Sequence, residues 1–128
     1  MARILIADDD HAYLDVFCDG MAAMGHEAVG VSRGDAALDR LRKEDFDIVF
    51  LDVIMPGGGA ITLGHSVRNM NAELPIVVIT GRPELGHSPL LRNGLRFAQA
   101  KLQKTASLSE LDRTVRQLAP AANLNSNE

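Results

Sequence analysis

The fold of this chain is decided by the stretch Asp47-Ile48-Val49-Phe50-Leu51-Asp52-Val53-Ile54-Met55-Pro56-Gly57. Its apolar run predicts a β-strand over residues 47–51 that is buried on both faces, which is typical of parallel sheets covered by helices. Asp52 comes where this strand ends. Open α/β sheets build their binding sites at the carboxyl ends of their strands, so the stretch predicts a carboxylate in such a site.

Strand-like and helical segments alternate along the rest of the chain. Strands are expected at residues 3–7, 27–32, 47–51, 75–79 and 100–103. Apolar residues at helical spacing predict helices from Asp10, around Ala37–Leu41, around Leu63–Met70, over 89–99 and from Ser107. Strict alternation with short connections implies parallel strands, right-handed crossovers and helices on both faces of the sheet.

Size and composition restrict the class of protein. A chain of 128 residues with 46% hydrophobic and 23% charged residues is one ordinary globular domain. The net charge of −4 argues against a nucleic-acid or anionic-membrane surface. Cys18 is the only cysteine, which excludes an intrachain disulfide and favours a reducing compartment, the cytoplasm. No apolar run approaches the ~20 residues of a membrane span.

Carboxylates gather at the ends of two strands. Asp8 and Asp9 follow the strand at 3–7, and Asp52 ends the strand at 47–51. These two strands are neighbours in a doubly wound sheet, at the point where the chain reverses direction. Three clustered carboxylates repel one another, and a hard divalent cation such as Mg²⁺ relieves that repulsion. The pattern predicts a Mg²⁺ site, while Asp10 is expected to cap the following helix.

A hydroxyl and an amine are expected at the same edge of the sheet. Thr80 follows the strand-like residues Ile76–Ile79, and Gly81 leaves space beside it for a bound group. Lys104 follows the last strand and can supply a point charge for a phosphate. Together with the acidic cluster they indicate metal-assisted phosphoryl transfer. The four histidines are interpreted as surface residues, because none has a second ligand at metal-binding spacing.

These motifs resemble the receiver domain of bacterial two-component response regulators, of the chemotaxis-regulator type. The resemblance extends over residues 2–118 and is carried by Ile6-Ala7-Asp8-Asp9, Leu51-Asp52-Val53-Ile54-Met55-Pro56-Gly57, Ile76-Val77-Val78-Ile79-Thr80-Gly81 and Leu102-Gln103-Lys104. It implies a flavodoxin-like α/β fold, a (βα)5 three-layer sandwich with the parallel strand order 2-1-3-4-5.

The resemblance also implies a role for each matching residue. Asp52 would be the phosphoacceptor, Thr80 the switch hydroxyl and Lys104 the partner of the phosphoryl group. Mg²⁺ would be held by Asp8, Asp9, Asp52 and the backbone carbonyl of Ile54. The phosphoryl group would come from a sensor histidine kinase or a histidine phosphotransfer protein. The domain would then signal to an effector protein by contact, without being an enzyme beyond weak self-phosphorylation from small donors and self-dephosphorylation.

The chain departs from the family pattern in several places. Thr105 replaces the proline that normally follows the lysine, so a trans peptide bond is expected there. Lys101 stands where the family has its switch aromatic, and Gly57-Gly58-Gly59 gives the loop after the phosphoacceptor unusual freedom. Counting from Gly94 would make Lys101 the phosphate-contacting lysine, whereas counting back from the last helix gives Lys104, which we favour.

A receiver domain over residues 1–119 and a flexible tail over 120–128 are expected. The segment 81–89 is expected to change its conformation when Asp52 becomes phosphorylated. The chain would act as a stand-alone regulator unless it is a piece of a longer one.

The main alternative is a pseudo-receiver, a constitutive interaction module that is never phosphorylated, which the missing proline and aromatic favour. A phosphatase with an aspartate nucleophile would need a second acid at Ile54, and a flavin phosphate would be repelled by the carboxylates after the first strand.

Overall fold

Strands and helices alternate in the computed structural model of the protein, which describes residues 1–81 and 89–119. The elements are β1 (Arg3–Ala7), α1 (His11–Ala23), β2 (Glu27–Val31), α2 (Gly34–Lys43), β3 (Ile48–Asp52), α3 (Ala60–Met70), β4 (Ile76–Thr80), α4 (Pro89–Gly94), β5 (Ala100–Gln103) and α5 (Leu108–Leu118). The strands form one parallel sheet in the order β2-β1-β3-β4-β5. The expected flavodoxin-like fold is confirmed.

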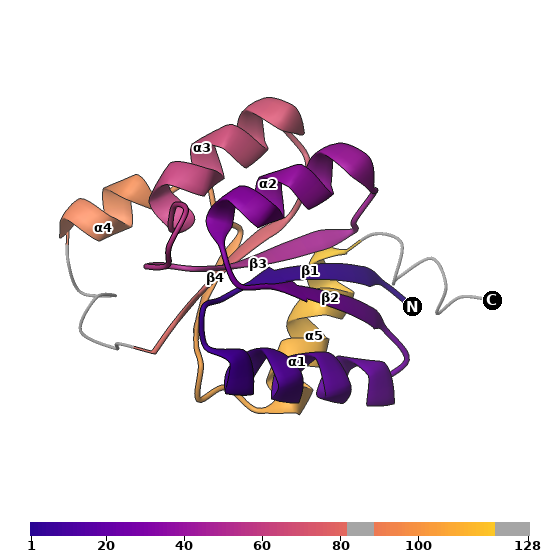
Figure 1. Cartoon of the computed structure of the whole chain (residues 1–128). Coiled ribbons are helices and arrows are strands. Elements are labelled where there is room, and N and C mark those ends of the chain that lie inside the picture. Colours follow the sequence, from indigo (N-terminus) through magenta and orange to yellow (C-terminus); the bar gives the residue numbers. More distant parts are fainter. Residues whose placement is uncertain (82–88, 120–128) are drawn as a thin grey trace.

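The helices cover the sheet in two layers (Figure 1). Helices α1 and α5 lie on one face, and α2, α3 and α4 lie on the other. None of the helices in the described part of the chain is long and apolar enough to cross a membrane. The expected tail at 120–128 lies outside the described residues, as does the expected switch segment apart from its two end residues, Gly81 and Pro89.

Each face of the sheet has its own hydrophobic core. Successive residues of β3 point alternately to the two faces, as the pleat of a strand requires. Val49 and Leu51 join the core beneath α2 and α3, whereas Ile48 and Phe50 join the core beneath α1 and α5. All five residues of β3 are buried, so this strand runs through the middle of the molecule. Asp52 is thereby carried into a poorly solvated position on a rigid element.

The helix starts expected near Asp10 and Ser107 are confirmed, whereas the expected end of α4 is wrong. Asp10 caps α1 by accepting a hydrogen bond from the Tyr13 amide at 3.1 Å, as predicted. Ser107 caps α5 in the same way, because its Oγ accepts a hydrogen bond from the Glu110 amide at 3.1 Å. Helix α4 begins at Pro89 but ends at Gly94, not at residue 99. Beyond Gly94 the chain makes a tighter turn in which the Ala98 amide donates to the Leu95 carbonyl.

His26 corrects the interpretation of the histidines as surface residues. Its side chain is buried, with 5% of the residue exposed. Nδ1 accepts a hydrogen bond from the Ala2 amide at 3.0 Å, so the ring proton lies on Nε2, which donates to Asp112 at 2.6 Å. The ring ties the start of β1 to α5. Sequence spacing could not reveal this role, because the partners are 24 and 86 residues away.

Arg68 joins two connections on the other side of the sheet, the one between α3 and β4 and the one between α4 and β5. Its guanidinium donates to the carbonyls of Asn71, Ala72, Leu74 and Phe97 and to the side chain of Gln99. We expect Arg68→Met to lower the free energy of unfolding by about 2 kcal/mol, since two part-buried carbonyls, those of Leu74 and Phe97, lose a charged donor. Urea unfolding measures this change, with Arg42→Met on the exposed side of α2 as the control. Equal effects of the two substitutions would contradict the structural role of Arg68.

Candidate functional site

The register of the central strands brings two aspartates side by side. Ala7 of β1 pairs with Leu51 of β3, so the next residue of each strand, Asp8 and Asp52, lies at the same level of the sheet. Asp52 in turn pairs with Ile79, which places Thr80 one step beyond it on β4. Parallel pairing therefore gathers residues far apart in the sequence at one edge, as the sequence predicts.

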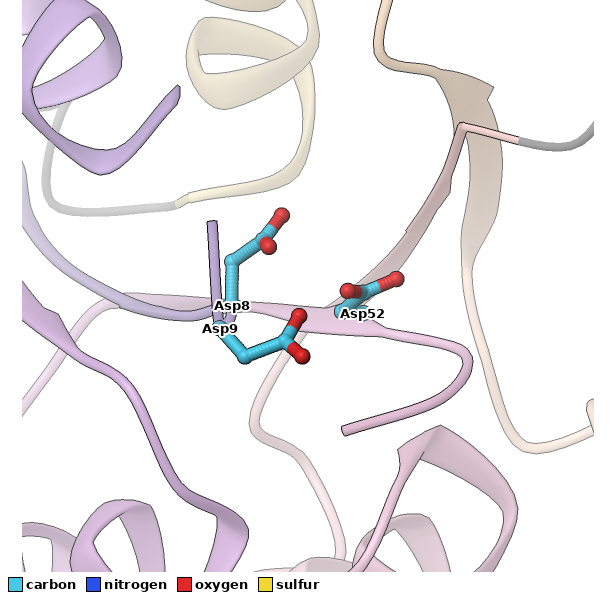
Figure 2. Close-up of side chains that lie close together, drawn as sticks. All are labelled: Asp8, Asp9 and Asp52. Atoms are coloured by element: carbon cyan, nitrogen blue, oxygen red, sulfur yellow. The ribbon is translucent and has the colours of Figure 1, made fainter. Parts of the chain in front are cut away.

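Three carboxyl groups meet at this edge (Figure 2). Oxygens of Asp8, Asp9 and Asp52 lie within 4.8 Å of one another. Asp8 is fully buried and Asp52 is 7% exposed, whereas Asp9 is exposed to solvent. The cluster thus consists of three carboxylates, two in a poorly solvated position and one open to solution.

Lys104 is the lysine that the structure brings to this cluster. Its Nζ lies 2.7 Å from Oδ2 and 2.9 Å from Oδ1 of Asp8, and 3.7 Å from Oδ2 of Asp52. The Lys104 amide donates to the Thr80 carbonyl at 2.9 Å, which fixes the end of β5 beside β4. Lys101 is exposed on β5, where Ala100 and Leu102 alternate with it toward the core.

The charges of the cluster act on one another. Burial, followed by the charge of Asp8, raises the pKa of Asp52 from 3.8 to about 6, although Lys104 opposes the shift. Burial alone would lower the pKa of Lys104, but its hydrogen bond to Asp8 and the charges of Asp52 and Asp8 raise it overall. Lys104 is therefore protonated and positively charged. The electrostatic potential at Asp52 remains negative, because the charges of Asp8 and Asp9 act on it.

A pocket of about 360 Å³ opens over these groups. It is lined by Asp9, Asp52, Val53, Ile54, Thr80, Gly81 and Lys104. Among residues 1–81 and 89–119, a side chain added at Gly81 would meet only Lys104 Cδ, at 3.7 Å, so the glycine leaves room beside Thr80 on this side, as expected. The Ile54 side chain is 61% exposed at the pocket. All the predicted site residues except the fully buried Asp8 therefore line one common space.

The glycine-rich loop after β3 packs against the start of α2. Gly57 and Gly58 have φ angles of 79° and 111°, which favour glycine. The Gly34 amide donates to the Pro56 carbonyl at 2.9 Å, and any side chain at Gly34 would collide with the Gly58 carbonyl. Sequence reasoning missed Gly34, because no local pattern indicates which loop will contact a helix start.

The peptide bond that follows Lys104 is trans, as expected for Lys104-Thr105. No cis peptide bond occurs in the part of the chain that the structure describes. A short turn closes behind the lysine, in which the Ala106 amide donates to the Gln103 carbonyl at 3.0 Å. Lys104 reaches the acidic cluster from this turn without a proline.

Comparison with known proteins agrees with this geometry. The model of the family described as "Response regulator receiver domain" matches residues 4–116. The chain belongs to that family. A solved structure of the response regulator protein TrrA from Thermotoga maritima, in complex with Mg(2+)-BeF, superposes with a TM-score of 0.80 at 24% identity, covering 92% of this chain and 99% of that one.

Curated relatives include other receiver proteins. The response regulator protein FleR of Pseudomonas aeruginosa is 35% identical over 79 residues, 62% of this chain and 17% of its own length. The response regulator receiver protein CpdR of Brucella abortus is 28% identical over 89 residues, 70% of this chain and 74% of its own length. The chain thus spans only a minor part of FleR. Receiver domains are signalling modules, generally not enzymes, that interact with histidine kinases or phosphotransfer proteins and bind Mg²⁺ at an acidic pocket.

The raised pKa of Asp52 makes a prediction about stability. A carboxyl group with a higher pKa in the folded than in the unfolded protein binds its proton more tightly when folded, so the wild-type protein loses stability as the pH rises from about 4 through 6. Asp52→Asn removes this loss and should be more stable by roughly 2 kcal/mol at pH 7.5, but not at pH 4. Thermal unfolding at both pH values, with a chelator present, measures the difference. A difference independent of pH would contradict the origin given for the shift.

Proposed function

We propose that this receiver domain accepts a phosphoryl group on Asp52 from the phosphohistidine of a sensor kinase or phosphotransfer protein. One observation carries the proposal: the Asp52 carboxylate faces a pocket that also holds the Lys104 ammonium 3.7 Å away and the carboxylate of Asp9. A nucleophile, a fixed cation and a set of acidic ligands are the parts that phosphoryl transfer requires. The domain covers residues 1–119 and acts in the cytoplasm.

The acidic cluster fits Mg²⁺. Asp8, Asp9 and Asp52 offer only hard oxygens, and burial together with the charge of Asp8 raises the pKa of Asp52, so a bound cation would stabilise its ionised form. Asp8, Asp9, Asp52 and the Ile54 carbonyl would hold the ion. When bound, Mg²⁺ would neutralise charge on the phosphoryl oxygens and orient them.

Asp52, Lys104 and Thr80 each have a separate role in the proposed phosphoryl transfer. A carboxylate oxygen of Asp52 attacks phosphorus in line with the leaving group. The new O–P bond forms as the P–N bond of the donor breaks, and the imidazole leaves with the electron pair. Lys104 stabilises negative charge on the phosphoryl oxygens. Thr80, which lines the pocket, donates a hydrogen bond from its hydroxyl to one of those oxygens once the phosphoryl group is on Asp52.

Output follows by protein contact. The acyl phosphate on Asp52 slowly loses its phosphoryl group to water, so the signal has a limited lifetime. An effector protein reads the changed surface in the interval. Lys101, exposed on β5 at the position where the family resemblance implies an aromatic residue, remains available to that partner. The proposed function includes no contact with nucleic acid or with a membrane.

Intact mass after incubation with a small-molecule phosphodonor and Mg²⁺ tests the proposal. We expect the wild-type chain to gain one phosphoryl group and Asp52→Asn to gain none. Asp47→Asn, directly before the start of β3 and at the opposite edge of the sheet from Asp52, is the matched control and should gain the group like the wild type. An unphosphorylated wild-type chain that still binds its partner would favour the alternative, a pseudo-receiver, for which Thr105 and Lys101 are the observations in favour.

A further inference from the structure

Tyr13 lies beside the proposed site, and neither the sequence motifs nor the proposed chemistry gives it a role. It belongs to the first turn of α1, three residues after the Asp10 cap. The Nζ atom of Lys104 lies 5.1 Å from the centroid of its ring. This is the distance at which a cation is attracted by the negative face of an aromatic ring. The same ammonium is held on its other side by Asp8 and Asp52.

The ring of Tyr13 is anchored to the hydrophobic core. It contacts the Phe17 ring, with centroids 6.2 Å apart, and Phe17 contacts Phe50 of β3 at 5.0 Å. Phe17 and Phe50 are buried, with 1% and 0% of their surfaces exposed. Since Phe50 precedes Asp52 by only two residues, the ring facing Lys104 and the strand carrying the carboxylate rest on the same packed residues.

The Tyr13 hydroxyl is buried and forms no hydrogen bond with the described residues, 1–81 and 89–119. Burial, with the charges of Asp8 and Asp52, raises the pKa of Tyr13 to about 12, so the ring stays neutral and its face stays attractive to a cation. Tyr13 therefore interacts with the site through its ring face, which contacts the Lys104 ammonium.

We propose that Tyr13 is a positioning residue for phosphoryl transfer, which holds the Lys104 ammonium at the Asp8–Asp52 pair. This role rests on the proposed function above. A lysine side chain has four rotatable methylene bonds, and two carboxylates alone leave its ammonium free to move around them. The ring supplies a third, fixed attraction from the α1 side. A cation that is already in place stabilises developing charge without reorganisation.

A pair of substitutions separates the ring face from the hydroxyl. Tyr13→Leu keeps an apolar side chain but removes the ring, and it should slow phosphorylation by a small-molecule donor about fivefold. Tyr13→Phe keeps the ring and should restore most of that rate. In the metal-free protein, NMR should show the Hε protons of Lys104 shifted upfield by the ring current in the wild type and in Tyr13→Phe, with the shift lost in Tyr13→Leu. Tyr13→Leu with the wild-type rate, or Tyr13→Phe as slow as Tyr13→Leu, would overturn the proposal.

A double-mutant cycle distinguishes positioning from a general packing role. If Tyr13 acts through Lys104, Tyr13→Leu should cause no further slowing in a Lys104→Met background. The same fivefold slowing in both backgrounds would mean that the ring acts on the fold or on another group, and would overturn the proposal. If the wild-type chain is not phosphorylated at all, the proposed function fails instead, and the Lys104 chemical shifts alone then decide whether Tyr13 holds the ammonium.

Discussion

Replacing Lys104 by Met should slow phosphorylation of Asp52 by a small-molecule donor by about 100-fold or more. Removing a single fixed group that stabilises transition-state charge typically costs two to three orders of magnitude in rate. In the proposed mechanism Lys104 is such a group, because its ammonium is 3.7 Å from the carboxylate of Asp52, the proposed nucleophile, and is only partly exposed. Methionine keeps most of the length and volume of the side chain, so the change is mainly one of charge. The rate of mass gain in Mg²⁺ buffer measures the effect.

Lys101→Met is the matched control for this prediction. The two lysines are three residues apart, and the same substitution removes the same charge from each. Lys101 lies exposed on β5, and its substitution should leave the rate within about twofold, as expected for a screened surface charge. If Lys101→Met slowed phosphorylation and Lys104→Met did not, the phosphate-contacting lysine would be Lys101, the alternative that counting from Gly94 suggests.

The sheet and the gathering of the site residues could be predicted from the sequence for a physical reason. Parallel strands buried on both faces are nearly continuous apolar runs, so β1, β3 and β4 stand out from their surroundings. Once those strands are placed, the parallel register brings Asp8, Asp52 and Thr80 to one edge without further information. Local patterns and a simple topology rule are sufficient for this part of the structure.

The remaining features depend on contacts between distant segments. His26 looks like a surface histidine in its local sequence, but it is buried against Ala2 and Asp112. The early end of α4 follows from Gly94 and the turn after it, where the helical spacing of apolar residues continues in the sequence. Tyr13 could have been noticed one turn after Asp9, but only the structure places its ring against Lys104. Long-range contacts of this kind leave no periodic signal.

Asp9→Ala should weaken Mg²⁺ binding by at least about tenfold, and as much as 100-fold, yet raise thermal stability. Loss of a group that only supports a metal ligand already costs about that much affinity, and Asp9 is expected to be a ligand itself. Its charge is also one of the causes of the raised pKa of Asp52, so its removal relieves repulsion in the metal-free protein. Isothermal titration with MgCl₂ and thermal unfolding with a chelator measure the two effects.

The neighbouring Asp10 gives the opposite expectation with the same substitution. Asp10 caps α1 through the Tyr13 amide, and replacing such a cap by Ala typically costs about 1 kcal/mol of stability. Asp10→Ala should therefore lower the melting temperature and leave Mg²⁺ affinity nearly unchanged. Two adjacent carboxylates would then change stability in opposite directions. A destabilised Asp9→Ala protein with normal Mg²⁺ affinity would remove Asp9 from the metal site.

Acid should weaken Mg²⁺ binding in the wild-type chain. Because the pKa of Asp52 is about 6, a proton competes with the ion once the pH falls below that value. The affinity should therefore decline between pH 7 and pH 5, before an ordinary aspartate with a pKa of 3.8 would be protonated. Asp9→Ala lowers the negative potential at Asp52, so the decline should begin at a lower pH in that variant. Identical pH profiles for the two proteins would show that the charge of Asp9 does not contribute to the raised pKa of Asp52.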